Sequence, residues 1–328
     1  MVNGFKTIFF INLIVIYIFS DVFFEFLNEV NNEKSEKLPK KEEIQINKTL
    51  ILYAYYEKDL LYVETFKFFI EFGLLESDDL DYIFIIQGGQ TNVTIPNYKN
   101  VRVLKRPNDC YDFGAYGKAL EWMGGIDMIR QYKNFIFINP SAIGPILPKY
   151  WPKEIKWTQI YTDRLVGDVH HVGSSIHCVE LHHIQSFGPR IEGYAFAATS
   201  VAVELSFKRG VFKCYTDKLK CIHEGEFGFG RVVLENNLNI EPLLLKFGKI
   251  DWRDKKNWKL VCPPEKHPSM KDNYDGDMSI HPLEVVFHKS IWTWFGKTES
   301  IVYHKEVLRY MKWARDRKES ETKEMIAN

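Results

Sequence analysis

The sequence predicts an α/β protein built on a mainly parallel sheet with helices on both faces. Short apolar runs rich in β-branched and aromatic residues alternate with segments of helical period, and these runs lack strict apolar–polar alternation. Composition agrees, because 45% hydrophobic and 15% aromatic residues among 328 can supply a sizeable core. The balance of 43 basic against 43 acidic residues argues against a nucleic-acid partner.

Strands and helices alternate in the first half of the chain. Strands are expected at 49–56, 82–87, 101–104 and 135–138, and helices at 62–75 and 113–123. Asp112 stands where the second helix would have its N-cap. The second half is less regular, with a strand passing into a helix at 196–212 and a charged helical tail at 306–327. Ligands of such sheets bind beyond the carboxyl ends of the strands, so the residues after each strand are the ones to examine.

The amino-terminal end carries a membrane-anchor signal. Residues 8–24 are apolar apart from Asn12, Ser20 and Asp21, and this run just reaches the length of a helix that crosses a hydrocarbon core of about 30 Å. No small-x-small cleavage site follows, so an uncleaved signal anchor is favoured over a cleaved signal peptide. We expect a cytosolic tail at 1–7, a transmembrane anchor at 8–24, a polar stem at 25–48, a folded domain at 49–300 and a charged helix at 301–328.

Two further signals concern the compartment. Asn47 and Asn92 begin acceptor triplets for N-glycosylation, which fit a lumenal glycoprotein. The five cysteines show no metal-ligand spacing. In an oxidising lumen Cys214 and Cys221 could close a short loop, and five buried free cysteines are the alternative. We therefore expect a single-pass type II membrane protein whose folded part lies in the lumen of the Golgi or ER.

Polar side chains follow the third expected strand and open a helix. A carboxylate and an amide at a helix N-terminus suit the ribose or base of a nucleotide, and a guanidinium suits a phosphate. Asp112, Asn108 and Arg106 supply these groups. A plain helix cap at Asp112 is the structural alternative.

Asn139 and Ser141 come directly after the fourth expected strand. Hard cations prefer carboxylate oxygens, so this neutral pair predicts no strongly bound metal, and an Asx-type turn before Pro140 is the alternative. Further along, His281 and Lys289 flank a short apolar run and could contact a diphosphate. No serine-hydrolase elbow, P-loop or dinucleotide-binding glycine motif follows a strand, which disfavours those enzyme classes.

Six segments, taken in order, resemble glycosyltransferases of the rhamnan-synthesis F type and related polysaccharide-building transferases, whose fold is GT-A-like and Rossmann-type. The resemblance spans about residues 49–295. The segments are 108–116 (NDCYDFGAY), 135–148 (FIFINPSAIGPILP), 165–178 (LVGDVHHVGSSIHC), 183–186 (HIQS), 226–234 (EFGFGRVVL) and 281–289 (HPLEVVFHK).

The resemblance implies a membrane-anchored, lumenal enzyme that transfers a hexosyl or deoxyhexosyl group from a nucleotide-sugar donor to a hydroxyl of a glycan or glycoconjugate. By matching motif, the residues near the donor would be Asn108, Asp112, Tyr116, Asn139 and Ser141. The donor-binding residues Arg106, His281 and Lys289 could supply the cationic help that the departing diphosphate needs. The residues in the acceptor cleft would be His183, Gln185 and Ser186. Glu226 would be the general base of an inverting transfer, which is weakly favoured over retention.

Two departures from the family pattern bear on activity. Many nucleotide-sugar transferases hold Mn²⁺ or Mg²⁺ with an Asp-x-Asp after the fourth strand, where this chain has Asn139 and Ser141. Both metal-dependent and metal-independent transfer therefore stay open. The family also tends to read Phe-Ala-Thr-Asp where this chain ends in Thr199-Ser200. These departures motivate an alternative, a catalytically lapsed homologue that binds glycans or assembles a complex.

Overall fold

The computed structural model describes residues 46–179, 188–262, 267–270, 272–289, 292–294, 297–299 and 305–327. The chain divides into two units, Met1–Ile44 and Gln45–Asn328, and the description concerns the second. The expected anchor and the three expected acceptor residues, His183, Gln185 and Ser186, lie outside the described residues. Among the helices that are described, none combines the length and apolar character needed to span a bilayer.

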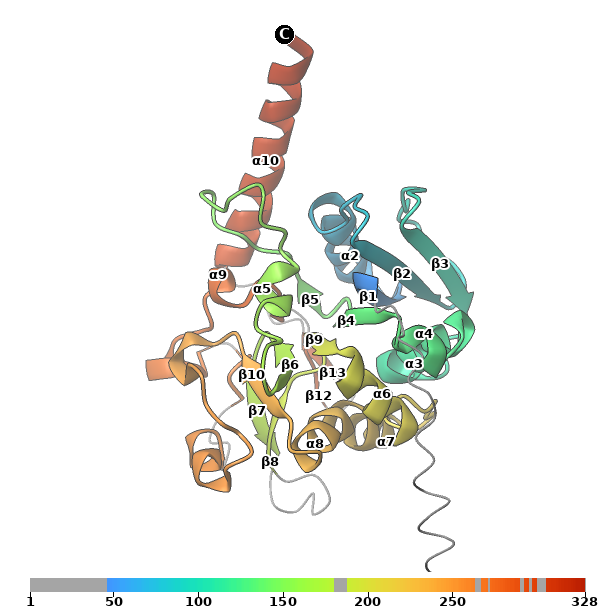
Figure 1. Ribbon diagram of the computed structural model, residues 1–328. Coiled ribbons are helices and arrows are strands. Elements are labelled where there is room, and N and C mark those ends of the chain that lie inside the picture. Colours follow the sequence, from blue (N-terminus) through green and yellow to red (C-terminus); the bar gives the residue numbers. More distant parts are fainter. Residues whose placement is uncertain are drawn as a thin grey trace, which may run out of the picture. The chain divides into compact units, whose positions relative to one another are not determined.

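A seven-stranded sheet forms the centre of the described unit, in the order β10-β6-β9-β4-β1-β2-β3 (Figure 1). Strands β3, β2, β1 and β4 are parallel, β10 is parallel to β6, and β9 runs antiparallel to both of its neighbours. This confirms the predicted α/β fold with a mainly parallel sheet. The bounds are β1 Ile46–Tyr56, β2 Leu80–Gln87, β3 Val101–Arg106, β4 Tyr132–Ile138, β6 Val169–Gly173, β9 Ala195–Thr199 and β10 Asn239–Pro242.

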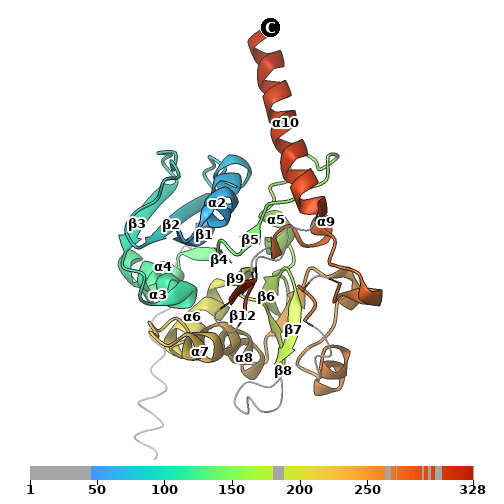
Figure 2. The same ribbon diagram turned by 180° about the vertical axis from the view of Figure 1, so that it is seen from behind.

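Helices cover both faces of this sheet, and Figure 2 shows α3, α4 and α6 next to one another. One core lies between the sheet and α3, α6 and α8, and the other lies against α2 and α5. The bounds are α2 Leu60–Phe72, α3 Tyr111–Met123, α4 Ile126–Ile129, α5 Gln159–Thr162, α6 Ser200–Lys208, α7 Lys218–Lys220, α8 Phe227–Glu235, α9 Pro282–Val285 and α10 Lys305–Ala327.

The remaining elements are short. They comprise the paired strands β5 (Ala142–Ile143) with β11 (His288–Lys289), β7 (Ile176–Val179) with β8 (Gly188–Ile191), and β12 (Trp292–Trp294) with β13 (Lys297–Glu299). One π-helical turn, η1, covers Cys221–Glu226, and three 3-10 turns cover Leu245–Phe247 (η2), Lys255–Leu260 (η3) and Asp275–Asp277 (η4).

Helix α3 begins two residues earlier than the sequence indicates. Cys110 occupies its N-cap position and makes no side-chain cap hydrogen bond, while Asp112 lies inside the first turn. The expectation of a cap at Asp112 is therefore wrong, and its carboxylate is left for other partners. The helix ends at Gly124, whose φ of 119° is a left-handed conformation that glycine adopts without steric cost.

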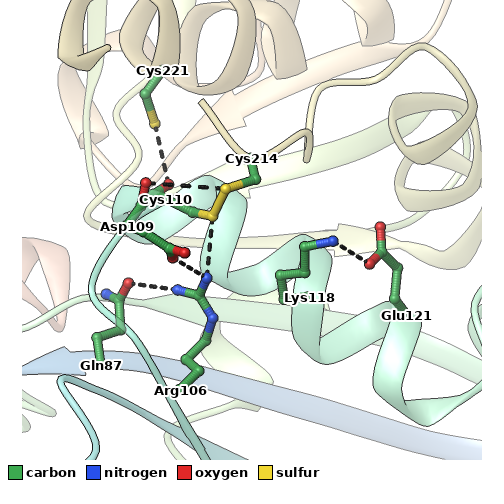
Figure 3. Close-up of a disulfide and its surroundings, with 8 residues drawn as sticks. All are labelled: Gln87, Arg106, Asp109, Cys110, Lys118, Glu121, Cys214 and Cys221. Carbon is green, nitrogen blue, oxygen red and sulfur yellow. Dashed lines mark hydrogen bonds and ion pairs between the residues drawn. A yellow bond between two sulfur atoms is a disulfide. The ribbon is translucent and has the colours of Figure 1, made fainter. Parts of the chain in front are cut away.

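Two disulfides connect distant segments: Cys110 pairs with Cys214 (Figure 3), and Cys178 pairs with Cys262. Cys221 is a buried free thiol. The expected Cys214–Cys221 loop is thus not formed. Cys110 lies two residues before Asp112, so the first disulfide fixes the start of α3.

Candidate functional site

The parallel strands β3, β2, β1 and β4 end at one edge of the sheet, here called the carboxyl edge. Asp112 reaches this edge from the first turn of α3, and Asn139 follows β4 directly. Nδ2 of Asn139 donates to Oδ2 of Asp112 at 2.7 Å. Oδ1 of Asn139 accepts from the backbone N–H of Ser141 at 3.1 Å and from the Ser141 hydroxyl. Hydrogen bonds therefore connect three of the expected donor residues. Asn139 also forms the Asx-type turn that was the structural alternative to a role in donor binding.

Glu226 comes to the same place from the junction of η1 and α8. Its Oε1 accepts from the backbone N–H of Gly193 at 2.8 Å. A Cβ at position 193 would lie 2.9 Å from Cγ of Glu226 and 2.9 Å from Cε2 of Phe113, so only glycine permits this approach. Burial raises the pKa of Glu226, Lys289 opposes the rise, and the negative charge of Asp112 adds to it.

Lys289 completes the group. It lies on β11, where it pairs with Ala142 of β5, directly after Ser141. Its Nζ lies 5.1 Å from the ring centroid of Tyr194. We call Asp112, Asn139, Ser141, Glu226 and Lys289 the edge cluster. All five residues are half-buried.

Arg106 supports the loop before α3. Its Nη1 donates to Oε1 of Gln87 at 3.1 Å, and its Nη2 contacts Sγ of Cys110 at 3.1 Å and pairs with Asp109 (Figure 3). These contacts hold the guanidinium at the ends of β2 and β3, next to the loop that carries Asp112.

Three other expected donor residues lie elsewhere. Asn108 is exposed on the loop before α3. Tyr116 is fully buried in the core, with its ring centroid 5.0 Å from that of Phe137, which argues against a contact with a bound nucleotide. His281 is exposed and its Nδ1 accepts from the N–H of Leu283, so it caps α9. Within the described ranges, no hydrogen bond connects His281 with the edge cluster.

Ser200, which stands where the resembled family tends to have an acid, lies far from this cluster. Thr199 at the end of β9 pairs with Asn134 at the start of β4, whereas Ala195 pairs with Ile138 at the end of β4. Ser200 is therefore at the opposite edge of the sheet from Asn139. Its substitution leaves the edge cluster unchanged and gives no support to a loss of activity there.

The oxygen donors that directly follow β4, on Asn139 and Ser141, are neutral and bind hard cations weakly, and the Asp112 carboxylate accepts a hydrogen bond from Asn139. The described part of the chain offers one group of three ligand-type side chains, Asp109 with Cys110 and Cys214. Its two sulfurs form a disulfide and cannot act as thiolates.

Glu192, Gly193 and Tyr194, in the turn between β8 and β9, were not among the expected site residues, and Gly193 and Tyr194 contact the edge cluster. The available signal was a glutamate and a glycine that interrupt the apolar run from Ile191 to Ala198. A separate cavity of about 500 Å³ lies beside the second disulfide, and its walls include His177, Cys262 and Tyr274 but no residue of the edge cluster.

The sequence matches no model of a known protein family, and no curated protein matches it. Among solved structures, the described fold is similar to a mannosyltransferase from Pyrobaculum calidifontis in complex with GDP-Man and Mn²⁺. The TM-score is 0.39 and the identity 11%, over 60% of this chain and 54% of that one, so the match spans about half of that protein. A likeness at this level does not assign a function.

Proposed function

We propose that this chain is a glycosyltransferase that uses a nucleotide-sugar donor. The observation that carries the proposal is the hydrogen bond between Asn139 and Asp112. These residues come from separate segments, 27 positions apart, and each was expected at the donor from its own motif. Their meeting point is the carboxyl edge of a parallel sheet, where such folds bind ligands.

The chemistry follows from the groups around that hydrogen bond. Asp112 and Asn139 would hold the ribose and diphosphate, and the Lys289 ammonium would stabilise the charge on the departing diphosphate. Glu226 would accept the proton of the acceptor hydroxyl as its oxygen bonds to the anomeric carbon and the bond to the diphosphate breaks. A raised pKa suits this role, because a general base works best with a pKa near the operating pH.

The enzyme would work on the lumenal side of a Golgi or ER membrane, held by the segment 8–24. Two disulfides support this part of the proposal, because disulfides persist in oxidising compartments. Asn47 and Asn92, the acceptors of the two glycosylation triplets, are both exposed. Peptide mapping after glycosidase treatment would test their modification.

The direct test is donor hydrolysis with a panel of uridine and guanosine diphosphate sugars, with and without Mn²⁺. We expect one donor to be turned over and Glu226→Gln to lower kcat by roughly 10²- to 10⁴-fold while nucleotide binding persists. Glu224→Gln is the matched control, since Glu224 lies in the same π-helical turn and pairs with Arg231. Full activity of Glu226→Gln would remove Glu226 from the mechanism.

A second candidate function, a glycan-binding or complex-assembling subunit, is favoured by the neutral Asn139 and Ser141 after β4. It predicts that no donor is hydrolysed in either metal condition while the protein still binds glycans. Saturable binding of a nucleoside diphosphate together with turnover would exclude it.

A further inference from the structure

In the segment Glu192-Gly193-Tyr194, the last two residues contact three members of the edge cluster, Glu226, Asn139 and Lys289. The N–H of Gly193 donates to Glu226. The carbonyl of Tyr194 accepts from the backbone N–H of Asn139 at 3.0 Å, and the Tyr194 ring lies beneath the Lys289 ammonium. The position of this segment therefore decides where the proposed base, donor contact and cation lie relative to one another.

Glu192 fixes the segment from the inside of the molecule. Its side chain is 5% exposed, and its carboxylate accepts from the hydroxyls of Ser175 and Ser269. His267 places Nε2 at 2.8 Å from Oε1 of the same carboxylate. Burial by itself would raise the pKa of Glu192, but the charges of His267 and Lys289 and the hydrogen bonds hold it well below the usual range. Glu192 is therefore ionised at neutral pH.

The surrounding contacts make this arrangement rigid. The Tyr194 hydroxyl donates to Oγ of Ser175 at 3.2 Å, and the N–H of Glu192 donates to the Ser175 carbonyl at 3.2 Å. The ring of His267 stacks on that of His177 with centroids 4.1 Å apart. A buried carboxylate with this many partners has one preferred position, because moving it would leave charged or polar groups unpaired.

We propose that Glu192 is a positioning residue of the proposed transfer, which holds Gly193 and Tyr194 against Glu226, Asn139 and Lys289. The inference rests on the proposed function. It differs from a purely structural role, because loss of a merely structural carboxylate would lower stability and leave kcat unchanged. The charge of Glu192 also tunes the protonation of Glu226.

The charged neighbours of Glu226 give the sign of that tuning. Lys289 lowers the pKa of Glu226, whereas Asp112 and Glu192 raise it. Arg190, Tyr116 and Cys221 also interact electrostatically with this carboxyl group. Removing the charge of Glu192 would therefore lower the pKa of Glu226, and the acid limb of the rate profile would move to lower pH.

The experiment measures kcat and KM for donor hydrolysis between pH 4 and 9 in the full chain. For Glu192→Gln we expect a ten- to hundredfold lower kcat, since small displacements of reacting groups have effects of this size, with donor KM little changed. The acid limb should shift downwards. Glu241→Gln is the matched control, because Glu241 is another buried carboxylate and is paired with Arg164 at 3.2 Å. This variant should keep the wild-type kcat and the wild-type position of the acid limb.

The possible results test the positioning role of Glu192 and the proposed function separately. The positioning role alone would be overturned if the wild type turns over a donor and Glu226→Gln loses this activity, while Glu192→Gln keeps the wild-type kcat and the wild-type acid limb. Absence of turnover by the wild type would overturn it together with the proposed function. If Glu192→Gln does not fold, Ser269→Ala removes one hydrogen bond from the carboxylate and should lower kcat by a smaller factor without moving the limb. Wild-type kcat in that variant would contradict the inference.

Discussion

At the scale of single residues, Tyr111 has a strained backbone beside the edge cluster. Its φ is 52°, a left-handed conformation that costs a residue with a side chain about 1–2 kcal/mol. It stands between Cys110, held by a disulfide, and Asp112, held by Asn139. Strain of this kind persists where the surroundings over-determine the backbone, which is common at functional sites.

This strain predicts an inverted order of stability for two variants. Tyr111→Gly should be more stable than Tyr111→Ala by about 1 kcal/mol in urea unfolding, because glycine adopts the left-handed region without penalty. The same pair at Lys118, exposed inside α3, should show the opposite order by a similar amount. An equal order at both positions would mean that Tyr111 is not left-handed in solution.

The sequence located some site residues because their place follows from strand direction alone. Asp112 and Asn139 come after parallel strands, so they meet at one edge. Glu192 and Gly193 could not be found in this way, because they lie at this edge only if β9 runs antiparallel to its neighbours. The apolar sequence of β9 does not indicate the direction in which the strand pairs. Tyr116 was misplaced because α3 passes beneath the sheet within one turn of Asp112, where Phe137 covers the ring.

At the scale of elements, the Cys110–Cys214 disulfide connects α3 with the loop after α6 over a sequence separation of 104. Replacing both cysteines by alanine should cost about 2–5 kcal/mol of the free energy of unfolding. Cys221→Ala, which breaks no disulfide, is the control and should cost less. Peptide mapping of the unreduced protein should recover Cys110 joined to Cys214 and Cys178 joined to Cys262. A Cys214–Cys221 link would contradict the structure.

The disulfide pairing shows why strands and helices are predicted better from sequence than the contacts between them. Strands β1, β2, β3 and β4 follow from apolar runs, and the change from strand to helix expected in 196–212 occurs at Ser200. Nearness in sequence suggested the Cys214–Cys221 pair. The intervening chain is helical instead, in α7 and η1, and it turns Cys221 inwards, where Sγ lies 4.0 Å from the Cys110 carbonyl.

At the scale of the described unit, α10 packs on elements far away in the sequence. Val307, Met311 and Ala314 are buried against Phe68 of α2 and against Ile143 and Ile146. The N–H of Leu147 donates to the Tyr310 hydroxyl at 2.8 Å. Arg315 pairs with Glu64 and Glu71 of α2. The sequence showed a charged helix, but its few apolar positions did not reveal which surface they cover.

This packing separates two truncations that remove neighbouring parts of one helix. Glu319, Ser320, Thr322 and Lys323 are exposed, so deleting 319–328 should change the free energy of unfolding by less than about 0.5 kcal/mol. Deleting 305–328 uncovers Phe68, Ile143 and Ile146 and should cost several kcal/mol, at roughly 1.5–3 kcal/mol for each large side chain returned to water. Ile143 belongs to β5, which follows Ser141 and pairs with Lys289, so the longer deletion should also weaken the binding of a nucleoside diphosphate, measured by titration. Equal stability and equal binding of the two truncated proteins would show that α10 does not support the carboxyl edge.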